Sequence, residues 1–345
     1  METVYKDGSE WIKDGKLLFN HFSWESSMRR ECFCVGVLTF AALFVASRAS
    51  GAEAVELKTK TGVIKGTLLL PDAPKPCPLV IFISGSGPTD RDGNNPLGGK
   101  NDSLKMLAEG LAAKGIGSLR FDKRGIGESA KALAKESDIR FESYIDDVVE
   151  WGKMYRDDPR FSSLIILGHS EGSLIGMVAC GKLEVKGFVS IAGSGRPAAD
   201  LILSQLEPKL PPANFEEVKA IVEKLKKGET VKDVPPADPL FRPSVQPYIL
   251  SWFKYDPAVE IGKLKVPALV IQGTTDIQAS VEDAKLLNKA CKNSDLFLVE
   301  GMNHILKQVP DDQLQQMKSY NDPSLPVVPE VTDRIAAFIK GLESK

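Results

Sequence analysis

The chain has 345 residues, of which 43% are hydrophobic and 26% charged, with a formal net charge of −2 at pH 7. This length and apolar content are sufficient for a sizeable core in a large α/β domain. The near-neutral balance argues against a nucleic-acid partner, and five cysteines without a Cys-x-x-Cys pair argue against a disulfide scaffold or a structural zinc site.

The first element is an apolar segment near the N-terminus. Met28 is followed by two arginines, an apolar run of about 15 residues and small residues that end at Ala52. This order is typical of a secretory signal peptide. Residues 1–52 are therefore expected to be a leader and signal peptide, with translation starting at Met28 and cleavage after Ala52 or Ala49. The product would be exported to the periplasm or the outside of the cell, and an anchoring or buried apolar helix is the alternative.

From residue 53 onward, short apolar runs alternate with helix-like segments. The expected strands cover 55–58, 63–70, 79–83, 117–121, 164–167, 187–192, 268–271 and 296–299, and the expected helices cover 103–114, 141–155, 173–180, 281–290 and 331–342. Strands that alternate with helices indicate a mostly parallel central sheet with helices on both faces. Residues 53–345 are predicted to form one domain of this α/β kind.

The alternation stops at Gly193 and resumes at residue 268. Residues 196–263 between these points are helix-like and rich in proline, with an amphipathic segment at 215–227. Insertions at the carboxyl ends of strands lie over the ligand crevice of open α/β sheets. This segment is therefore expected to be a helical cap inserted late in the sheet.

A Gly-x-Ser-x-Gly motif stands where a predicted strand meets a predicted helix. Residues 168–172 read Gly-His-Ser-Glu-Gly and directly follow the apolar run 164–167. In this context Ser170 is expected to sit at a sharp, strained turn that exposes its hydroxyl at the end of the sheet as a nucleophile. Glycine stands on both sides because a Cβ there would crowd the strand against the helix.

A serine hydroxyl is a weak nucleophile and needs a base. The sequence has only three histidines. His21 lies in the leader, and His169 is adjacent to the nucleophile, where the turn is expected to point its side chain elsewhere. His304 remains as the predicted base, because it follows a strand as a loop residue and comes after the serine in chain order.

The third member of such a triad is an acid on a loop after a strand, between the serine and the histidine in the chain. Asp276 follows the buried run 268–271 and fits this position. The rivals Asp256, Asp283 and Asp295 fit less well, because they lie before a proline in the cap, on the next helix and at the start of a strand.

The transition state also needs an oxyanion hole of two backbone N–H groups. One is expected from Glu171, the residue after the nucleophile, and the other from the loop after the strand 79–83. Ser86 is the predicted donor in that loop, with Gly87 as the next choice.

Two further polar motifs lack a clear catalytic spacing. Residues 90–94 resemble the start of a calcium loop, but Asn101 stands where such a loop requires glutamate, so a polar loop at the rim of the crevice is predicted. The Gly-rich turn 121–129 fits neither a Walker loop nor a dinucleotide fingerprint. Asp122 and Arg124 are expected to pair within the protein and shape this turn.

Taken together, these motifs resemble the α/β-hydrolase superfamily. The resemblance rests on residues 168–172, on the Asp-x-Arg-Gly-x-Gly-x-Ser turn at 122–129, and on Asp276 and His304. Residues 85–94, 251–257 and 272–278 look more narrowly like the bacterial EstD-type esterases, in the serine aminopeptidase S33-like group. Many superfamily members have His-Gly at the oxyanion loop, where this sequence has Ser84-Gly85, but the backbone donors do not depend on that side chain.

The resemblance implies the α/β-hydrolase fold and a serine carboxylesterase that hydrolyses small-molecule esters with short acyl chains. It also implies an enzyme that needs no metal. No cofactor, no nucleic-acid partner and no stable membrane association after signal cleavage are expected either. The sequence leaves open a peptidase or acyltransferase with the same triad, a lipase, or a non-catalytic binding protein of this fold. Oligomeric state and natural substrate are not predicted.

Overall fold

The computed structural model describes residues 51–73, 76–235 and 238–344. The predicted leader and all but the last two residues of the predicted signal peptide lie outside these ranges. Within the described ranges, no helix has both the length and the apolar character that a membrane crossing requires.

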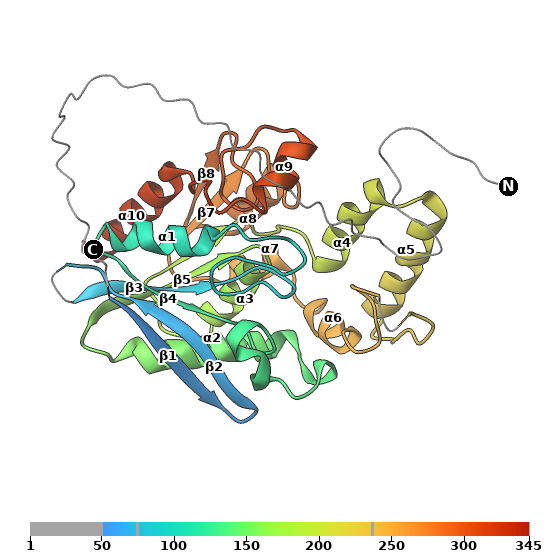
Figure 1. Ribbon diagram of the computed structural model, residues 1–345, viewed down its shortest axis with the longest axis horizontal. Coiled ribbons are helices and arrows are strands. Elements are labelled where there is room, and N and C mark those ends of the chain that lie inside the picture. Colours follow the sequence, from blue (N-terminus) through green and yellow to red (C-terminus); the bar gives the residue numbers. More distant parts are fainter. Residues whose placement is uncertain (1–50, 74–75, 236–237, 345) are drawn as a thin grey trace, which may run out of the picture. The chain divides into compact units, whose positions relative to one another are not determined.

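The described strands form a single sheet in the order β1-β2-β4-β3-β5-β6-β7-β8 (Figure 1). They are β1 (Ala52–Thr59), β2 (Gly62–Leu69), β3 (Cys77–Ile83), β4 (Gly117–Phe121), β5 (Phe161–His169), β6 (Gly187–Ile191), β7 (Ala268–Gly273) and β8 (Ser294–Val299). β2 pairs antiparallel with β1 and β4, and all other neighbours are parallel. The prediction of a mostly parallel sheet is therefore confirmed.

Helices cover both faces of this sheet, as predicted (Figure 1). They are α1 (Ser103–Ala112) and α10 (Pro329–Glu343) on one face, and α2 (Phe141–Arg156), α3 (Glu171–Cys180) and α8 (Val281–Ala290) on the other. Alternate residues of β3 enter the two cores: Ile81 and Ile83 face α2 and α3, whereas Val80 and Phe82 face α1 and α10. The continuous apolar run of this strand follows from burial on both faces.

The helical cap lies between β6 and β7. It contains α4 (Ala198–Leu206), α5 (Pro212–Lys226) and α6 (Gln246–Trp252), and α7 (Pro257–Gly262) leads back to the sheet and packs against α3 and α8. The first three of these helices surround their own small core, made by Ala199, Ile202, Val222, Leu225, Val234, Phe241 and Ile249. The cap is joined to the main core at α2, where the Phe141 N–H donates to Ser251 Oγ at 2.8 Å.

Some local structure differs from the sequence prediction. The expected helix 103–114 begins at Ser103 as predicted but ends at Ala112, and its N-cap residue Asp102 has a positive φ of 52°. A helix that the apolar pattern did not predict, α9 (Gln313–Ser319), follows the His304 loop. Its apolar residues Leu314 and Met317 are exposed, so it lacks the buried stripe on which a prediction from periodicity depends.

Candidate active site

Ser170 stands at the sharp turn between β5 and α3. Its φ of 55° and ψ of −123° are strained for a residue with a side chain, as predicted. The flanking glycines allow this turn, because a Cβ on Gly168 would lie 2.2 Å from the Gly172 oxygen and one on Gly172 would lie 2.3 Å from the Ile83 oxygen. The fold therefore accepts strain at this residue and places the serine at the carboxyl edge of the sheet.

The structure brings four of the five predicted site residues to one cavity of about 270 Å³ beneath the cap, and the fifth, Asp276, contacts His304 from outside its lining. Ser170, His304, Ser86 and Glu171 all line it. Ser170 and Glu171 come from the turn after β5, Ser86 from the loop after β3, and His304 from the loop after β8. The carboxyl ends of adjacent parallel strands meet at one edge, which explains how residues so far apart in the chain converge.

Asp276 holds the ring of His304. Its Oδ2 atom lies 2.8 Å from His304 Nδ1 and also accepts from Gln272 Nε2 at 2.9 Å, and its Oδ1 atom accepts the N–H groups of Gln278 at 2.7 Å and Ala279 at 3.0 Å. Burial alone would raise the pKa of Asp276, but the imidazole of His304 and the backbone donors hold it below its usual range. The carboxylate is thus an acceptor, so Nδ1 carries the ring proton and Nε2 is left as the basic atom.

The loop that carries His304 is fixed by its neighbours. Asn303 is fully buried, and its Oδ1 atom accepts the N–H groups of Ile305 at 3.2 Å and Lys307 at 3.0 Å. Its Nδ2 atom donates to Ser319 Oγ at 2.8 Å. The loop is therefore ordered on both sides of the histidine, which restricts the position of the ring.

His169 does not point away from the site, and the sequence interpretation was wrong on this point. Its ring lies 4.8 Å from that of His304, centroid to centroid, and its Nε2 atom donates to the His304 carbonyl oxygen at 2.8 Å. Burial lowers the pKa of His169 to about 4, and the neighbouring His304 adds to this effect. A neutral His169 thus supports the backbone of His304.

Lys123 is a site residue that the sequence interpretation did not identify. Its side chain is 2% exposed, and its Nζ atom donates to the Gly85 carbonyl oxygen and lies 3.2 Å from Glu171 Oε2. In a trans peptide the C=O and the next N–H point in opposite directions. Because Lys123 holds the Gly85 carbonyl, it also fixes the direction of the Ser86 N–H, the second predicted oxyanion donor.

Glu171 joins this arrangement to the cap. Its Oε1 atom accepts from the hydroxyl of Tyr248 on α6 at 2.6 Å, while its other oxygen faces Lys123. Its backbone N–H belongs to the first residue of α3 and so has no partner within the helix. This N–H and that of Ser86 therefore stay the predicted oxyanion donors. A signal for Lys123 existed in the sequence, since a lysine two residues after a buried strand is near the core and needs a polar partner there.

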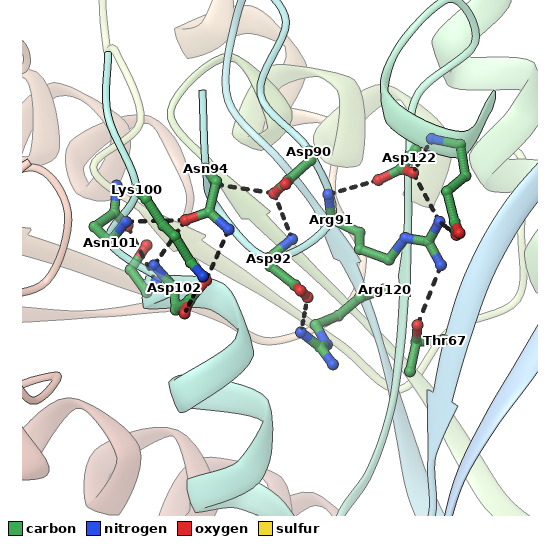
Figure 2. A network of polar contacts seen from close by, with 12 residues as sticks. Thr67, Asp90, Arg91, Asp92, Asn94, Lys100, Asn101, Asp102, Arg120 and Asp122 are labelled. Carbon is green, nitrogen blue, oxygen red and sulfur yellow. Dashed lines mark hydrogen bonds and ion pairs between the residues drawn. The ribbon is translucent and has the colours of Figure 1, made fainter. Parts of the chain in front are cut away.

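The loop between β3 and α1 is held by a polar network (Figure 2). Arg91 donates from its backbone N–H to Asp122 Oδ1 at 2.8 Å and from its guanidinium to Asp122 Oδ2 at 2.7 Å, and Asp92 pairs with Arg120 on β4. Asp90 Oδ1 accepts the N–H groups of Asp92 and Asn94, both at 2.9 Å. The carboxylates of the calcium-like motif are therefore used within the loop, by Asp90, and to attach the loop to β4, by Asp92. In the ranges that the structure describes, no cluster of three His, Cys, Asp or Glu side chains is arranged for a metal ion.

Asp122 and Arg124 do not pair with each other. Asp122 pairs with Arg91, and Arg124 makes two contacts with Asp147 on α2. Both pairs shape the turn after β4, but each partner comes from a different element. The partner of Asp122 follows from the sheet order, because β4 is next to β3 and so lies beside the β3–α1 loop. The partner of Arg124 follows from the packing of α2.

The three rival aspartates serve other contacts. Asp256 accepts from the N–H of Ala258 and caps α7, and Asp295 pairs with Arg334 at 3.1 Å. Asp283 pairs with Arg196 at 2.8 Å. Burial would raise the pKa of Asp283, but the hydrogen bonds from Arg196 and Ser280 outweigh it and lower the pKa to about 2. Of the four candidates, Asp276 is the one that contacts His304.

The sheet order, the cap between β6 and β7, and the serine at a strained strand-to-helix turn define an α/β-hydrolase. A family model described as "Serine aminopeptidase, S33" matches residues 98–308, more than half of the chain. The chain belongs to this family, and the resemblance stated from its motifs is confirmed.

Relatives with known names fit this assignment. Esterase EstD of Thermotoga maritima is 29% identical over 251 residues, which cover 70% of this chain and 58% of that protein, so the chain spans less than two thirds of that relative's length. Est1E from Butyrivibrio proteoclasticus has a TM-score of 0.55 at 17% identity, with 85% of this chain and 99% of that chain covered. An esterase from Pyrococcus furiosus has a TM-score of 0.53 at 17% identity, with 85% and 91% covered. At these identities the two solved structures show the fold alone.

Proposed function

We propose that this chain is a serine carboxylesterase that hydrolyses small-molecule esters with short acyl chains through an acyl-enzyme on Ser170. The observation that carries the proposal is the 2.8 Å contact between His304 Nδ1 and Asp276 Oδ2, in a cavity that Ser170 also lines. The similarity to Esterase EstD supports an ester as the substrate.

In the proposed reaction, His304 Nε2 takes the Ser170 proton while the serine oxygen attacks the ester carbonyl carbon. The negative charge moves to the carbonyl oxygen, which the Ser86 and Glu171 N–H groups hold, and each such donor contributes about 3–4 kcal/mol to the transition state. The carbon–oxygen bond to the alcohol then breaks, and the proton passes from His304 to the departing alcohol oxygen. Asp276 stabilises the imidazolium throughout.

The second half of the reaction repeats these steps with water. His304 takes a proton from a water molecule, whose oxygen attacks the acyl carbon. The oxyanion donors hold the second tetrahedral intermediate until the bond to the serine oxygen breaks. The proton returns to Ser170, and the free acid leaves the cavity.

Among its described residues, the cavity has no carboxylate free to bind an ammonium group, and this favours an ester over a peptide with a free amino terminus as the substrate. An aminopeptidase needs a carboxylate for the substrate ammonium group. Among the described residues that line the large cavity, Glu171 is the sole carboxylate, and its two oxygens already face Tyr248 and Lys123. An amidase or acyltransferase with the same triad remains the second candidate, and peptide p-nitroanilides compared with p-nitrophenyl esters would distinguish them.

The proposal is tested by hydrolysis of p-nitrophenyl butanoate. Ser170→Ala should reduce kcat by about 10⁶, since the nucleophile and the base act as a unit. Ser163→Ala is the matched control, because Ser163 lies on the same strand, outside the cavity, where its hydroxyl contacts Glu343. Full activity in folded Ser170→Ala would overturn the proposal.

We also propose that the chain is exported by the signal peptide between Met28 and Ala52. The support is the order of basic, apolar and small residues in that segment. Mass spectrometry of the protein outside the cytoplasm would test this, and a mature N-terminus before Met28 would contradict it.

A further inference from the structure

Two cavities of different character meet at the nucleophile. The large cavity beneath the cap has apolar walls, which include Leu174, Ile202, Leu206, Leu240, Ile249 and Trp252. A second cavity of about 200 Å³ has polar walls, which include Thr89, Asn95, Asn101, Gln278 and Tyr320. Ser86, Ser170, Gln278 and His304 line both cavities, so a substrate bound at Ser170 has access to each of them.

The second cavity is polar but has no charged wall. None of the described residues that line it is Asp, Glu, Lys or Arg. The acidic and basic side chains of the neighbouring loop turn into the network of Figure 2 instead, where Asp92 pairs with Arg120 and Arg91 with Asp122. A charged group in this cavity would lose hydration without gaining a counter-ion, and this disfavours charged occupants.

The polar walls retain unused hydrogen-bonding capacity. Tyr320 accepts from Gln278 Nε2 at 2.6 Å and so keeps its own proton to donate, and burial raises the pKa of this hydroxyl, which keeps it neutral. Asn95 Nδ2 uses one hydrogen on Thr89 Oγ1 at 3.1 Å and has a second. The side-chain oxygen of Gln278 is an acceptor. Donors next to acceptors match hydroxyl groups, each of which both donates and accepts.

The walls are held in place from two directions. The first wall is the β3–α1 loop, whose Lys100 N–H donates to Asn321 Oδ1 at 3.2 Å. The second wall is the segment after α9. A Cβ on Gly99 of the first wall would lie 2.4 Å from the backbone carbonyl oxygen of Tyr320 in this segment. The close approach of these two segments makes the cavity a preformed site, which lowers the entropic cost of binding.

We propose, as an extension of the esterase function proposed above, that the second cavity binds the alcohol half of the substrate and that this alcohol is small, uncharged and rich in hydroxyl groups, such as a monosaccharide. The acyl half then occupies the apolar cavity. The two halves of an ester extend in opposite directions from the carbon that Ser170 attacks. His169, His304 and Ile305 line the polar cavity, so an alcohol there leaves beside the base that must protonate it.

The test compares butanoate esters that share the acyl group and differ in the alcohol. Methyl 6-O-butanoyl-glucoside and cyclohexylmethyl butanoate have similar shapes, but only the first carries ring hydroxyls. We expect kcat/KM for the sugar ester to exceed that for the cyclohexyl ester by about 25-fold, because two hydrogen bonds each contribute about five-fold. Butyrylcholine, with a charged alcohol, should be the poorest of the three.

The variant Tyr320→Phe removes one hydroxyl from the polar wall. It should lower kcat/KM for the sugar ester about five-fold more than kcat/KM for the cyclohexyl ester, which is the effect of one neutral hydrogen bond. Tyr255→Phe is the matched control, because the Tyr255 hydroxyl contacts Glu142 at 3.3 Å and lines neither cavity.

The outcomes separate this inference from the proposed function. If the enzyme hydrolyses all three esters equally, or prefers the cyclohexyl ester, the alcohol site is refuted while the esterase function stands. An equal effect of Tyr320→Phe on the sugar and cyclohexyl esters would also refute it. If no ester is hydrolysed, including p-nitrophenyl butanoate, the proposed function itself fails.

Discussion

The substitution Asp276→Asn tests the role of the acid with the least change of shape. Asp276 Oδ1 accepts two backbone N–H groups, which cannot reverse, at 2.7 and 3.0 Å. The asparagine must therefore keep its oxygen at that position and present its NH₂ group to His304 Nδ1 and to Gln272 Nε2, which now face the carboxylate at 2.8 and 2.9 Å. A donor opposite Nδ1 forces the ring proton onto Nε2.

A ring protonated at Nε2 cannot accept the Ser170 proton. The wrong tautomer costs about 10⁴ in kcat, which corresponds to about 5.5 kcal/mol. Steady-state hydrolysis of p-nitrophenyl butanoate measures this loss, and thermal unfolding shows that the variant is folded. Asp295→Asn is the control, because its carboxylate is largely exposed and contacts Arg334. If folded Asp276→Asn kept more than a tenth of the wild-type kcat, the tautomer argument would be refuted.

Two further predictions concern buried groups beside the proposed triad. Lys123→Met releases the Gly85 carbonyl and with it the Ser86 N–H, so kcat for p-nitrophenyl butanoate should fall by about 10–100-fold with KM nearly unchanged; a kcat within two-fold of wild type would show that Lys123 does not orient this peptide. The pKa of His169 is lowered to about 4 in the folded protein. As the pH falls below about 6.5, His169 is therefore protonated in the unfolded chain but stays neutral in the folded protein. The free energy of unfolding should therefore decrease by about 3 kcal/mol more between pH 7 and 4 in the wild type than in His169→Gln, which keeps a donor for the His304 carbonyl. If the free energy of unfolding fell equally in the wild type and in His169→Gln between pH 7 and 4, the lowered pKa of His169 would be contradicted.

The sequence predicted the elements that a buried face or a fixed motif determines. The strand at Gly117–Phe121 and the helix at Val281–Ala290 have the bounds that their apolar patterns indicate. The strained serine follows from its two glycines, because their steric requirement is local. Asp276 and His304 could be chosen as the candidate acid and base, because few residues of the right type follow a strand and also come after Ser170 in the required chain order.

The sequence could not predict contacts that depend on strand order or on side-chain direction. His169 is the last residue of β5, and its contact with His304 depends on where the loop after β8 lies. The partners of Asp122 and Arg124 are separated from them by 31 and 23 residues, respectively. The polar cavity could not be predicted for the same reason, because Asn95, Gln278 and Tyr320 belong to three segments that only the fold brings together.

The loop between β3 and α1 connects these features. One end carries Ser86 and its peptide with Gly85, held by Lys123, and the remainder forms a wall of the polar cavity. Arg91 and Asp122, whose side chains are 11% and 3% exposed, anchor it to the end of β4. A buried ion pair contributes little net stability, because desolvation offsets much of its attraction. We infer that this pair serves mainly to fix the position of the loop, so that one anchor positions both the predicted oxyanion donor and a wall of the proposed alcohol site.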